Sequence, residues 1–234
     1  MSDPQLALRV TSTVDQLPLD RTCDLELELV LTNRGRKAIE IYPNAAKLAA
    51  TASYAGIGIT WAIALIPAGS ETPLPLLELR RWYGPPGNPP SPAYAKQQAV
   101  SLAAGEEHVA HLVACWIPNA HLSPDHLAPA VLDPEGMDNV APRSWTPPPG
   151  YPMPPPLVES FPLAQASVLV FNATAPAIEA AMRDKPDFLR GHVVAFVPGA
   201  GAYELHAGYQ QSSWMGLGST FDVRATPLRL VVSA

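Results

Sequence analysis

Charge is the property that this chain has least of. Only 15% of its 234 residues are charged, compared with about 25% in typical soluble domains. The formal net charge is −6 and no block of basic residues occurs, which argues against nucleic-acid binding, because that binding depends on basic side chains meeting phosphates. The scarcity of charge also predicts that part of the apolar surface is covered by a partner or by a packed loop.

Cysteine is nearly absent as well. The two cysteines, Cys23 and Cys115, are not spaced as a zinc motif or a redox pair. Each lies in a strand-like run, so we expect two reduced and buried thiols. A disulfide between them is the alternative.

Motifs for catalysis and for membrane insertion are missing too. The sequence has no Gly-x-Ser-x-Gly motif and no glycine-rich phosphate loop followed by lysine, so we expect no enzyme activity and no cofactor. The apolar run 55–66 ends at Pro67 and is too short to span a bilayer. No basic region followed by an apolar stretch opens the chain. We therefore expect a cytoplasmic protein without membrane contact; a secreted protein whose leader has been removed is the alternative.

What the chain does have is period-two alternation. The clearest run is 23–33, in which leucines alternate with polar residues, as a strand with one buried face requires. Turn-forming residues follow at 33–36 and predict a hairpin with a returning strand at 39–42. The same kind of pattern predicts further strands at 6–10, 57–66, 76–83, 108–117, 168–171, 192–197, 203–210 and 228–232.

A glycine-rich turn before one of these strands has a recognisable form. Gly201, Tyr203 and Leu205 stand where an immunoglobulin-type domain carries its Gly-x-Tyr-x-Cys run, with leucine replacing the cysteine. The first 117 and last 45 residues thus resemble a bacterial immunoglobulin-like β-sandwich. The resemblance implies that Tyr203 is structural, its hydroxyl bonded to nearby backbone, and that Trp61 is the core tryptophan. It implies nothing about a substrate.

Two segments interrupt the strands. Residues 118–165 form a proline-rich insertion, because thirteen of the 28 prolines lie between 118 and 162. Residues 175–186 are predicted to form one short helix, with a proline in its first turn and Pro186 at its end. The expected fold is therefore all-β: one immunoglobulin-like antiparallel sandwich over 1–234, carrying the insertion and the helix. A loop of this length is usually functional, disordered or a linker.

The function expected from these features is binding or scaffolding without catalysis, with a protein or peptide partner; a homo-oligomer stays open. We expect the insertion to dock on the sandwich and to form the partner surface, rather than to be a flexible linker. The side chains assigned to that surface are Trp145, Tyr151, Met153, Leu157, Trp82 and Tyr83. The run 148–151 also matches the Pro-Pro-x-Tyr pattern that WW domains bind.

Two other functions remain open. Aromatic residues in loops, including Trp214, suit a carbohydrate-binding module. His121, Asp125 and His126 are spaced so that a folded loop could bring them onto a metal ion, which would give a metal-binding or enzymatic domain. Their spacing matches neither a zinc motif nor a calcium loop, so we assign no metal ligand.

Overall fold

A computed structural model describes most of the strand-forming part of the chain. The described residues are 5–44, 47–50, 59–74, 76–78, 96–123, 126, 165–185, 188–189, 192–211 and 219–234. For 47–50, 59–60 and 76–78 only the backbone is described.

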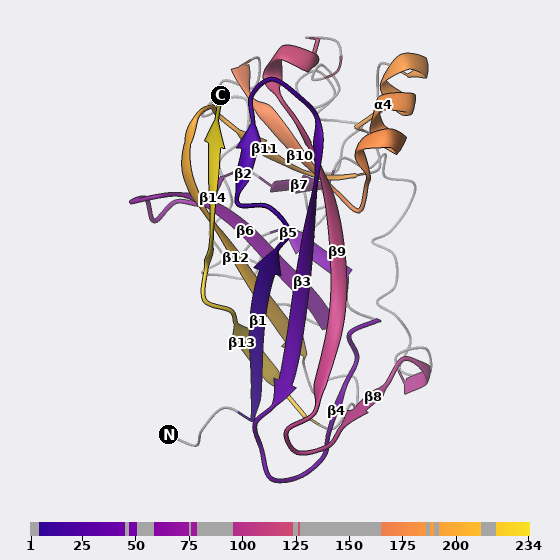
Figure 1. The fold of residues 1–234 in the computed structure, drawn as a ribbon. Coiled ribbons are helices and arrows are strands. Elements are labelled where there is room, and N and C mark those ends of the chain that lie inside the picture. Colours follow the sequence, from indigo (N-terminus) through magenta and orange to yellow (C-terminus); the bar gives the residue numbers. More distant parts are fainter. Residues whose placement is uncertain are drawn as a thin grey trace, which may run out of the picture.

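The first sheet has six strands, and every pair of neighbours in it is antiparallel. Figure 1 shows its long strands β1, β3 and β9 side by side. In spatial order the strands are β1 (Leu6–Ser12), β3 (Cys23–Asn33), β9 (Glu107–Ile117), β10 (Ser167–Phe171), β11 (Val193–Val197) and β7 (Leu76–Glu78).

The second sheet is built around one long strand, β12. Its spatial order is β2 (Gln16–Pro18), β14 (Leu228–Ser233), β12 (Gly201–Gln211), β6 (Ile59–Pro67) and β5 (Lys47–Ala50), and β13 (Phe221–Arg224) pairs with β12 beyond the end of β14. The fold is mostly β, as predicted. The expectation of purely antiparallel pairing is wrong at two outer positions, where β2 runs parallel to β14 and β5 runs parallel to β6.

The predicted hairpin between 23–33 and 39–42 is also wrong. Strand β4 (Ile39–Ile41) pairs with β8 (Val100–Leu102) in a separate two-stranded sheet. Both edges of β3 are already occupied, by β1 and β9. In addition, the buried Asn33 amide donates to the carbonyl oxygens of Lys37, Leu102 and Ala103. These bonds join the turn after β3 to the end of β8, so the returning strand is directed to β8.

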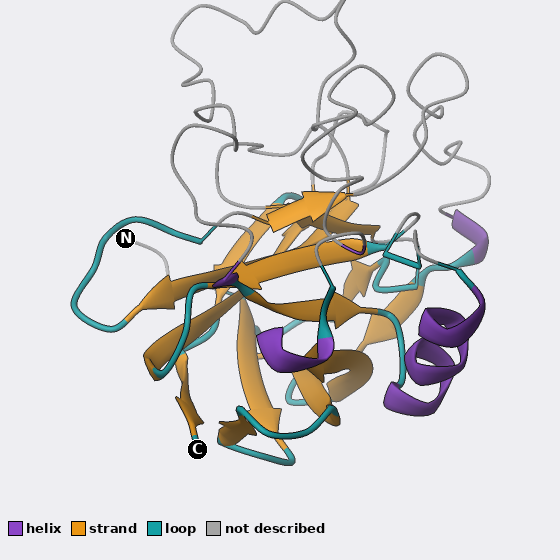
Figure 2. Cartoon of the chain, turned by 90° about the horizontal axis from the view of Figure 1, so that it is seen from above, coloured by secondary structure: helices purple, strands orange, loops and turns teal. Residues whose placement is uncertain are grey.

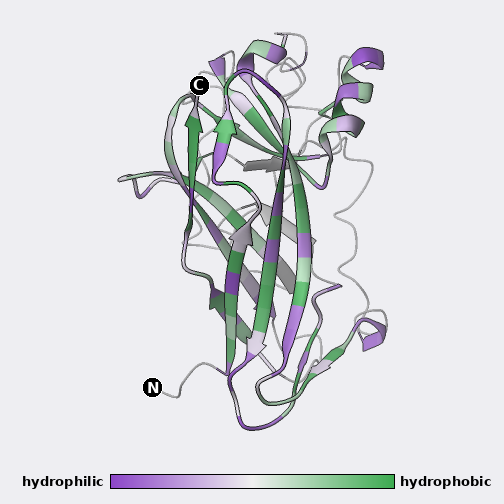
Figure 3. Cartoon of the chain, viewed as in Figure 1, coloured by the Kyte–Doolittle hydropathy of each residue, from purple (hydrophilic) through white to green (hydrophobic). Residues whose placement is uncertain are grey.

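The two sheets share one core. Leu25, Leu27, Leu29 and Leu31 project from β3 into the same buried cluster as the inward row of β12, which is Tyr203, Leu205, Ala207 and Tyr209. Figure 3 shows the corresponding alternation of hydrophobic and hydrophilic residues along β3. Period-two alternation therefore identified the buried faces of both long strands correctly.

A second, smaller core lies on the outer side of the first sheet. Strands β10 and β11 are buried on both faces, because helix α4 (Ala175–Asp184) and the pair Phe188 and Leu189 cover the side that turns away from the second sheet. Figure 2 shows α4 standing outside the strands. The helix was predicted at 175–186. Its first backbone N–H, at Ala175, donates to the carboxylate of Asp24 on β3 at 2.6 Å, which ties the start of the helix to the sheet.

The corner before β12 contains the contact that the sequence predicted. The Tyr203 hydroxyl donates to the carbonyl oxygen of Gly199 at 2.8 Å. Gly199 and Gly201 have φ values of 154° and 155°, a region that side chains other than glycine rarely adopt. The glycines therefore allow the tight turn, and the tyrosine holds it closed.

Replacing Tyr203 with phenylalanine is expected to lower the free energy of unfolding by about 1–2 kcal/mol, because the Gly199 carbonyl loses its donor while the ring remains buried. Urea denaturation of the variant and of the unmodified protein measures the difference. A change below about 0.3 kcal/mol would show that the hydroxyl does not stabilise the corner.

The cysteines face opposite sides of the first sheet. Cys23 is in register with Trp116, whereas Cys115 is in register with Asp24, so the two thiols belong to different cores. Both are free, and this geometry is incompatible with the disulfide alternative. The prediction that both are buried holds for Cys115, but Cys23 is only half-buried, because it lies at the first residue of β3, at the margin of the main core.

We expect thiol titration with Ellman's reagent to give two free thiols after denaturation and to separate them in the folded protein. Burial raises the pKa of Cys115 to about 12 and raises the pKa of Cys23 as well. Because the thiolate is the reactive form, Cys23 should react slowly in the folded protein and Cys115 only on unfolding. Equal rates for both thiols under native conditions would contradict this placement.

Candidate functional site: the outward face of the second sheet

All six side chains assigned to partner binding from the sequence lie outside the described residues. This is true of Trp82, Tyr83, Trp145, Tyr151, Met153 and Leu157, and of Trp214 and Asp125. Of the insertion at 118–165, the structure describes only 118–123, 126 and 165. Its assignment as the partner surface stays a prediction.

The two histidines of the metal alternative are held in separate contacts. His121 Nδ1 lies 3.1 Å from the Thr22 hydroxyl. His126 Nδ1 accepts the backbone N–H of Ser123, and the ring packs edge-on against Phe188. Because the Nδ1 atom of His126 accepts this hydrogen bond, that atom is not available as a metal ligand. Within the described ranges no group of three or more histidine, cysteine or acidic side chains is placed to hold a metal ion.

Trp61 and Tyr209 meet in a buried polar network that the sequence did not indicate. Their ring centroids lie 4.9 Å apart, and the Trp61 indole donates to the carbonyl oxygen of Pro43. The Tyr209 hydroxyl accepts the backbone N–H of Tyr42 and donates to the Gln211 amide oxygen. The only available signal was a polar residue, Gln211, in the inward row of β12. This network attaches the segment after β4 to the second sheet.

Two half-buried histidines give the protein a predictable response to acid. Burial lowers the pKa of His108 below its usual 6.5 and does the same for His192, although a backbone hydrogen bond with Phe171 opposes it there. The unfolded chain therefore binds more protons than the folded chain once the pH falls below about 6.5.

Stability is accordingly expected to be independent of these groups above about pH 7 and to decrease as the pH falls through 6.5 toward their lower folded values. Urea denaturation at pH 7.5, 6.5 and 5.5 measures the decrease. A variant carrying His108→Gln and His192→Gln should lose part of this slope. An unchanged slope in that variant would assign the acid response to other groups.

The candidate site is the face of the second sheet that turns away from the core. On β12 the outward side chains alternate with the buried ones. The strand register shows which residues of β6 and β14 lie beside them on the same face. The outward residues that are at least partly exposed are Ala62, Ala64, Ile66, Ala202, Glu204, His206, Gln210, Arg229 and Val231. The face thus combines small apolar side chains with Glu204, His206, Gln210 and Arg229, and β13 adds the exposed Asp222 and Arg224.

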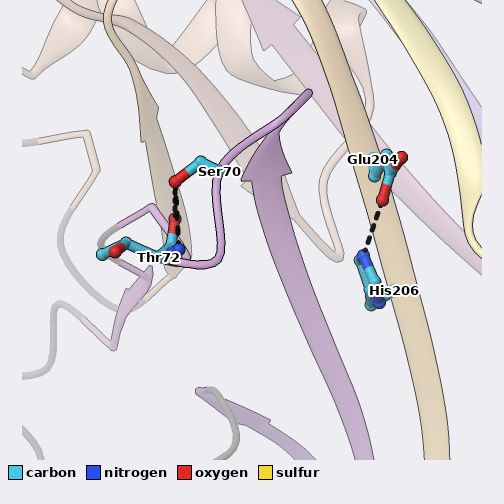
Figure 4. A network of polar contacts seen from close by, with 4 residues as sticks. All are labelled: Ser70, Thr72, Glu204 and His206. Carbon is cyan, nitrogen blue, oxygen red and sulfur yellow. Dashed lines mark hydrogen bonds and ion pairs between the residues drawn. The ribbon is translucent and has the colours of Figure 1, made fainter.

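A contact between a histidine and a carboxylate lies near the middle of this face. His206 Nε2 lies 3.2 Å from a carboxylate oxygen of Glu204, two residues earlier on β12 (Figure 4). Figure 4 also shows the loop after β6, in which the Ser70 hydroxyl accepts the backbone N–H of Thr72 at 3.0 Å. The start of this loop is attached to β12 through a hydrogen bond from Ala68 N–H to the Ala202 carbonyl. In the described part of the chain, His206 makes no side-chain contact with a hydroxyl or a thiol that could serve as a nucleophile.

No family model, no curated protein and no solved structure matches this chain. No helix within the described ranges is both long enough and apolar enough to cross a membrane.

Proposed function

We propose that the chain is an immunoglobulin-like β-sandwich that binds a protein partner without catalysis. Support for the fold comes from the strand order. An immunoglobulin-type sandwich pairs its strands A, B and E in one sheet and C, F and G in the other. Here β1, β3 and β9 are neighbours in one sheet, and β6, β12 and β14 are neighbours in the other. Tyr203, near the start of β12, corresponds to the tyrosine that closes the corner before strand F.

The proposed fold departs from the usual pattern between β9 and β12. Strands β10 and β11 and helix α4 follow β9 in the chain and extend the first sheet beyond it. Their side chains form most of the second core. The additions widen the first sheet.

The observation that carries the function is the outward face of β6, β12 and β14. Ala62, Ala64 and Ile66 are all partly exposed there, on positions that polar residues normally occupy when a sheet faces water. Apolar side chains that stay partly exposed side by side on a sheet are a feature of surfaces that contact another protein.

A carbohydrate-binding module is supported less well. Sugar recognition of the type considered above uses exposed aromatic rings. Every aromatic side chain within the described ranges is buried, so this part of the chain offers no ring on which a sugar could stack. The carbohydrate alternative therefore depends entirely on the loop aromatics outside those ranges.

A photo-cross-linking amino acid at two matched positions tests the proposal. We place p-benzoylphenylalanine at Ala64 on the candidate face, and at Val109 on the outer face of the first sheet as the control. Val109 is 43% exposed and is the one large exposed hydrophobic residue in the described part of the chain. Irradiation in the cells that naturally make the protein should give a discrete protein adduct from position 64 and none from position 109. No adduct from 64, or the same adducts from both positions, would refute binding through this face.

A further inference from the structure

The outward face of the second sheet has features that fit a second copy of the same face. We propose that two copies of this chain associate through β6, β12, β13 and β14, face to face about a twofold axis. This inference rests on the proposed function and names the partner for the same surface. It is carried by the charges and the residue register of the face, and the area sets the expected strength.

The charges on the face are balanced, although the whole chain is acidic. Arg229 and Arg224 are exposed beside Glu204 and Asp222, which are exposed as well. The chain as a whole has a net charge of −6, so two copies repel each other over most of their surfaces. A face with equal numbers of acidic and basic groups is where that repulsion is smallest. Neither arginine forms an ion pair within the described ranges, so both remain available to a partner.

The strand register makes the pattern self-complementary. Going along β12, the outward rows are Arg229 with Glu204, then His206 with Ala64, then Gly208 with Ala62 and Arg224, then Gln210 with Asp222. A twofold axis that lies in the plane of the face and crosses the strands between His206 and Gly208 exchanges the first row with the fourth and the second with the third.

That exchange brings compatible groups together. Arg229 of one copy lies across from Asp222 of the other, and Glu204 lies across from Gln210. The His206 ring lies across from Gly208, which is buried beside the Arg224 side chain, so the ring meets the stem of that arginine. Ala64 lies across from Ala62. An axis through His206 itself would instead set Arg229 against Arg224, so the pattern selects one register. Packed sheets normally cross at about 30°, which the long arginine side chain can follow.

The area of the face fits a weak association. Eleven residues of β12 extend roughly 36 Å at about 3.3 Å per residue. The face is three strands wide, because β14 and β13 follow one another along the same edge of β12 and β6 lies on the other. At about 4.8 Å per strand it covers roughly 14 Å in the other direction. The face therefore measures roughly 500 Å² per copy, and two copies bury roughly 1,000 Å², the lower limit for a specific interface.

Sedimentation velocity of the purified full chain over a wide concentration range tests the inference. The unmodified protein should dimerise. Arg229→Asp and Asp222→Arg should each weaken the dimer at least tenfold, because each places like charges across the axis. The variant with both changes exchanges the two charges and should recover most of the affinity. Val109→Glu on the first sheet is the matched control and should have no effect, and circular dichroism verifies that each variant is folded.

The outcomes separate this inference from the proposed function. A monomer at every concentration, or a dimer that ignores both charge reversals, refutes association through this face. If that monomer still gives a discrete adduct with a different protein from position 64, binding through the face stands and only the identity of the partner changes. If position 64 gives no adduct and the protein is monomeric, both proposals fail.

Discussion

Replacing Tyr209 with phenylalanine is expected to lower the free energy of unfolding by about 3 kcal/mol, more than any other removal of a single hydroxyl in the described part of the chain. The Tyr209 hydroxyl is fully buried and serves as an acceptor and a donor at once, joining the Tyr42 backbone N–H to the Gln211 side chain. Phenylalanine leaves both partners buried without a bond, and each such group costs about 1–3 kcal/mol. Urea denaturation followed by circular dichroism measures the loss.

Two comparisons make this prediction specific. Tyr203→Phe removes a hydroxyl from the same strand but leaves only one partner, the Gly199 carbonyl, without its bond, so the loss should be clearly smaller. In the Tyr209→Phe background, Gln211→Leu should cost less than it does alone, because the bond between the two side chains is already gone. Gln211 also donates to the carbonyl oxygens of Glu40 and Ser219, so some cost should persist. Strict additivity of the two changes would show that the network is not coupled.

The second large effect is expected at Asn33. Its amide nitrogen donates to three carbonyl oxygens and its amide oxygen accepts the backbone N–H of Gly35 at 2.9 Å. The side chain is completely buried. Asn33→Ala leaves several of these groups without a partner and should cost about 3–4 kcal/mol. Asn33→Asp should cost at least as much, because it places a carboxylate among carbonyl oxygens.

Amide hydrogen exchange identifies where the Asn33 effect acts. The Gly35 amide should lose its protection in Asn33→Ala, while the central amides of β12 keep theirs relative to the new global stability. Thr32→Ala serves as the neighbouring control. Its hydroxyl donates to Glu107 at an exposed position, so we expect a change of less than about 1 kcal/mol. An equal loss in the two variants would mean that the position in the chain, and not the buried amide, causes the effect.

Local pattern was enough to predict the long strands and the helix. In β3 and β12 the alternation of large apolar and polar side chains admits only one buried face, and the proline at the start of α4 is compatible only with a first turn. The hydrogen-bonded corner at Tyr203 could also be predicted from the sequence, because its two glycines and its tyrosine lie within five residues of one another. Each of these features is determined by side chains that are close in the sequence.

Strand pairing was decided by the tertiary structure. The residues at 39–41 follow a turn that suits a hairpin, yet β4 pairs with β8, about sixty residues away in the sequence. The cause is Asn33, whose side chain bonds to carbonyl groups at 102 and 103. An asparagine at this position predicts a turn in either case. The sequence near Asn33 does not show that its side chain also bonds to a turn some seventy residues later.

For a related reason, the local sequence pattern could not predict the candidate site. On β6 the inward residues Trp61, Ile63 and Leu65 alternate with the outward residues Ala62, Ala64 and Ile66. All six are apolar, so the sequence reads as a strand buried on both faces, as β10 and β11 in fact are. What differs is the covering: α4 packs over β10 and β11, whereas the outward side of β6 stays partly exposed. The sequence alone determined that these strands are apolar on both sides, and only the tertiary structure decided which of those sides another element covers.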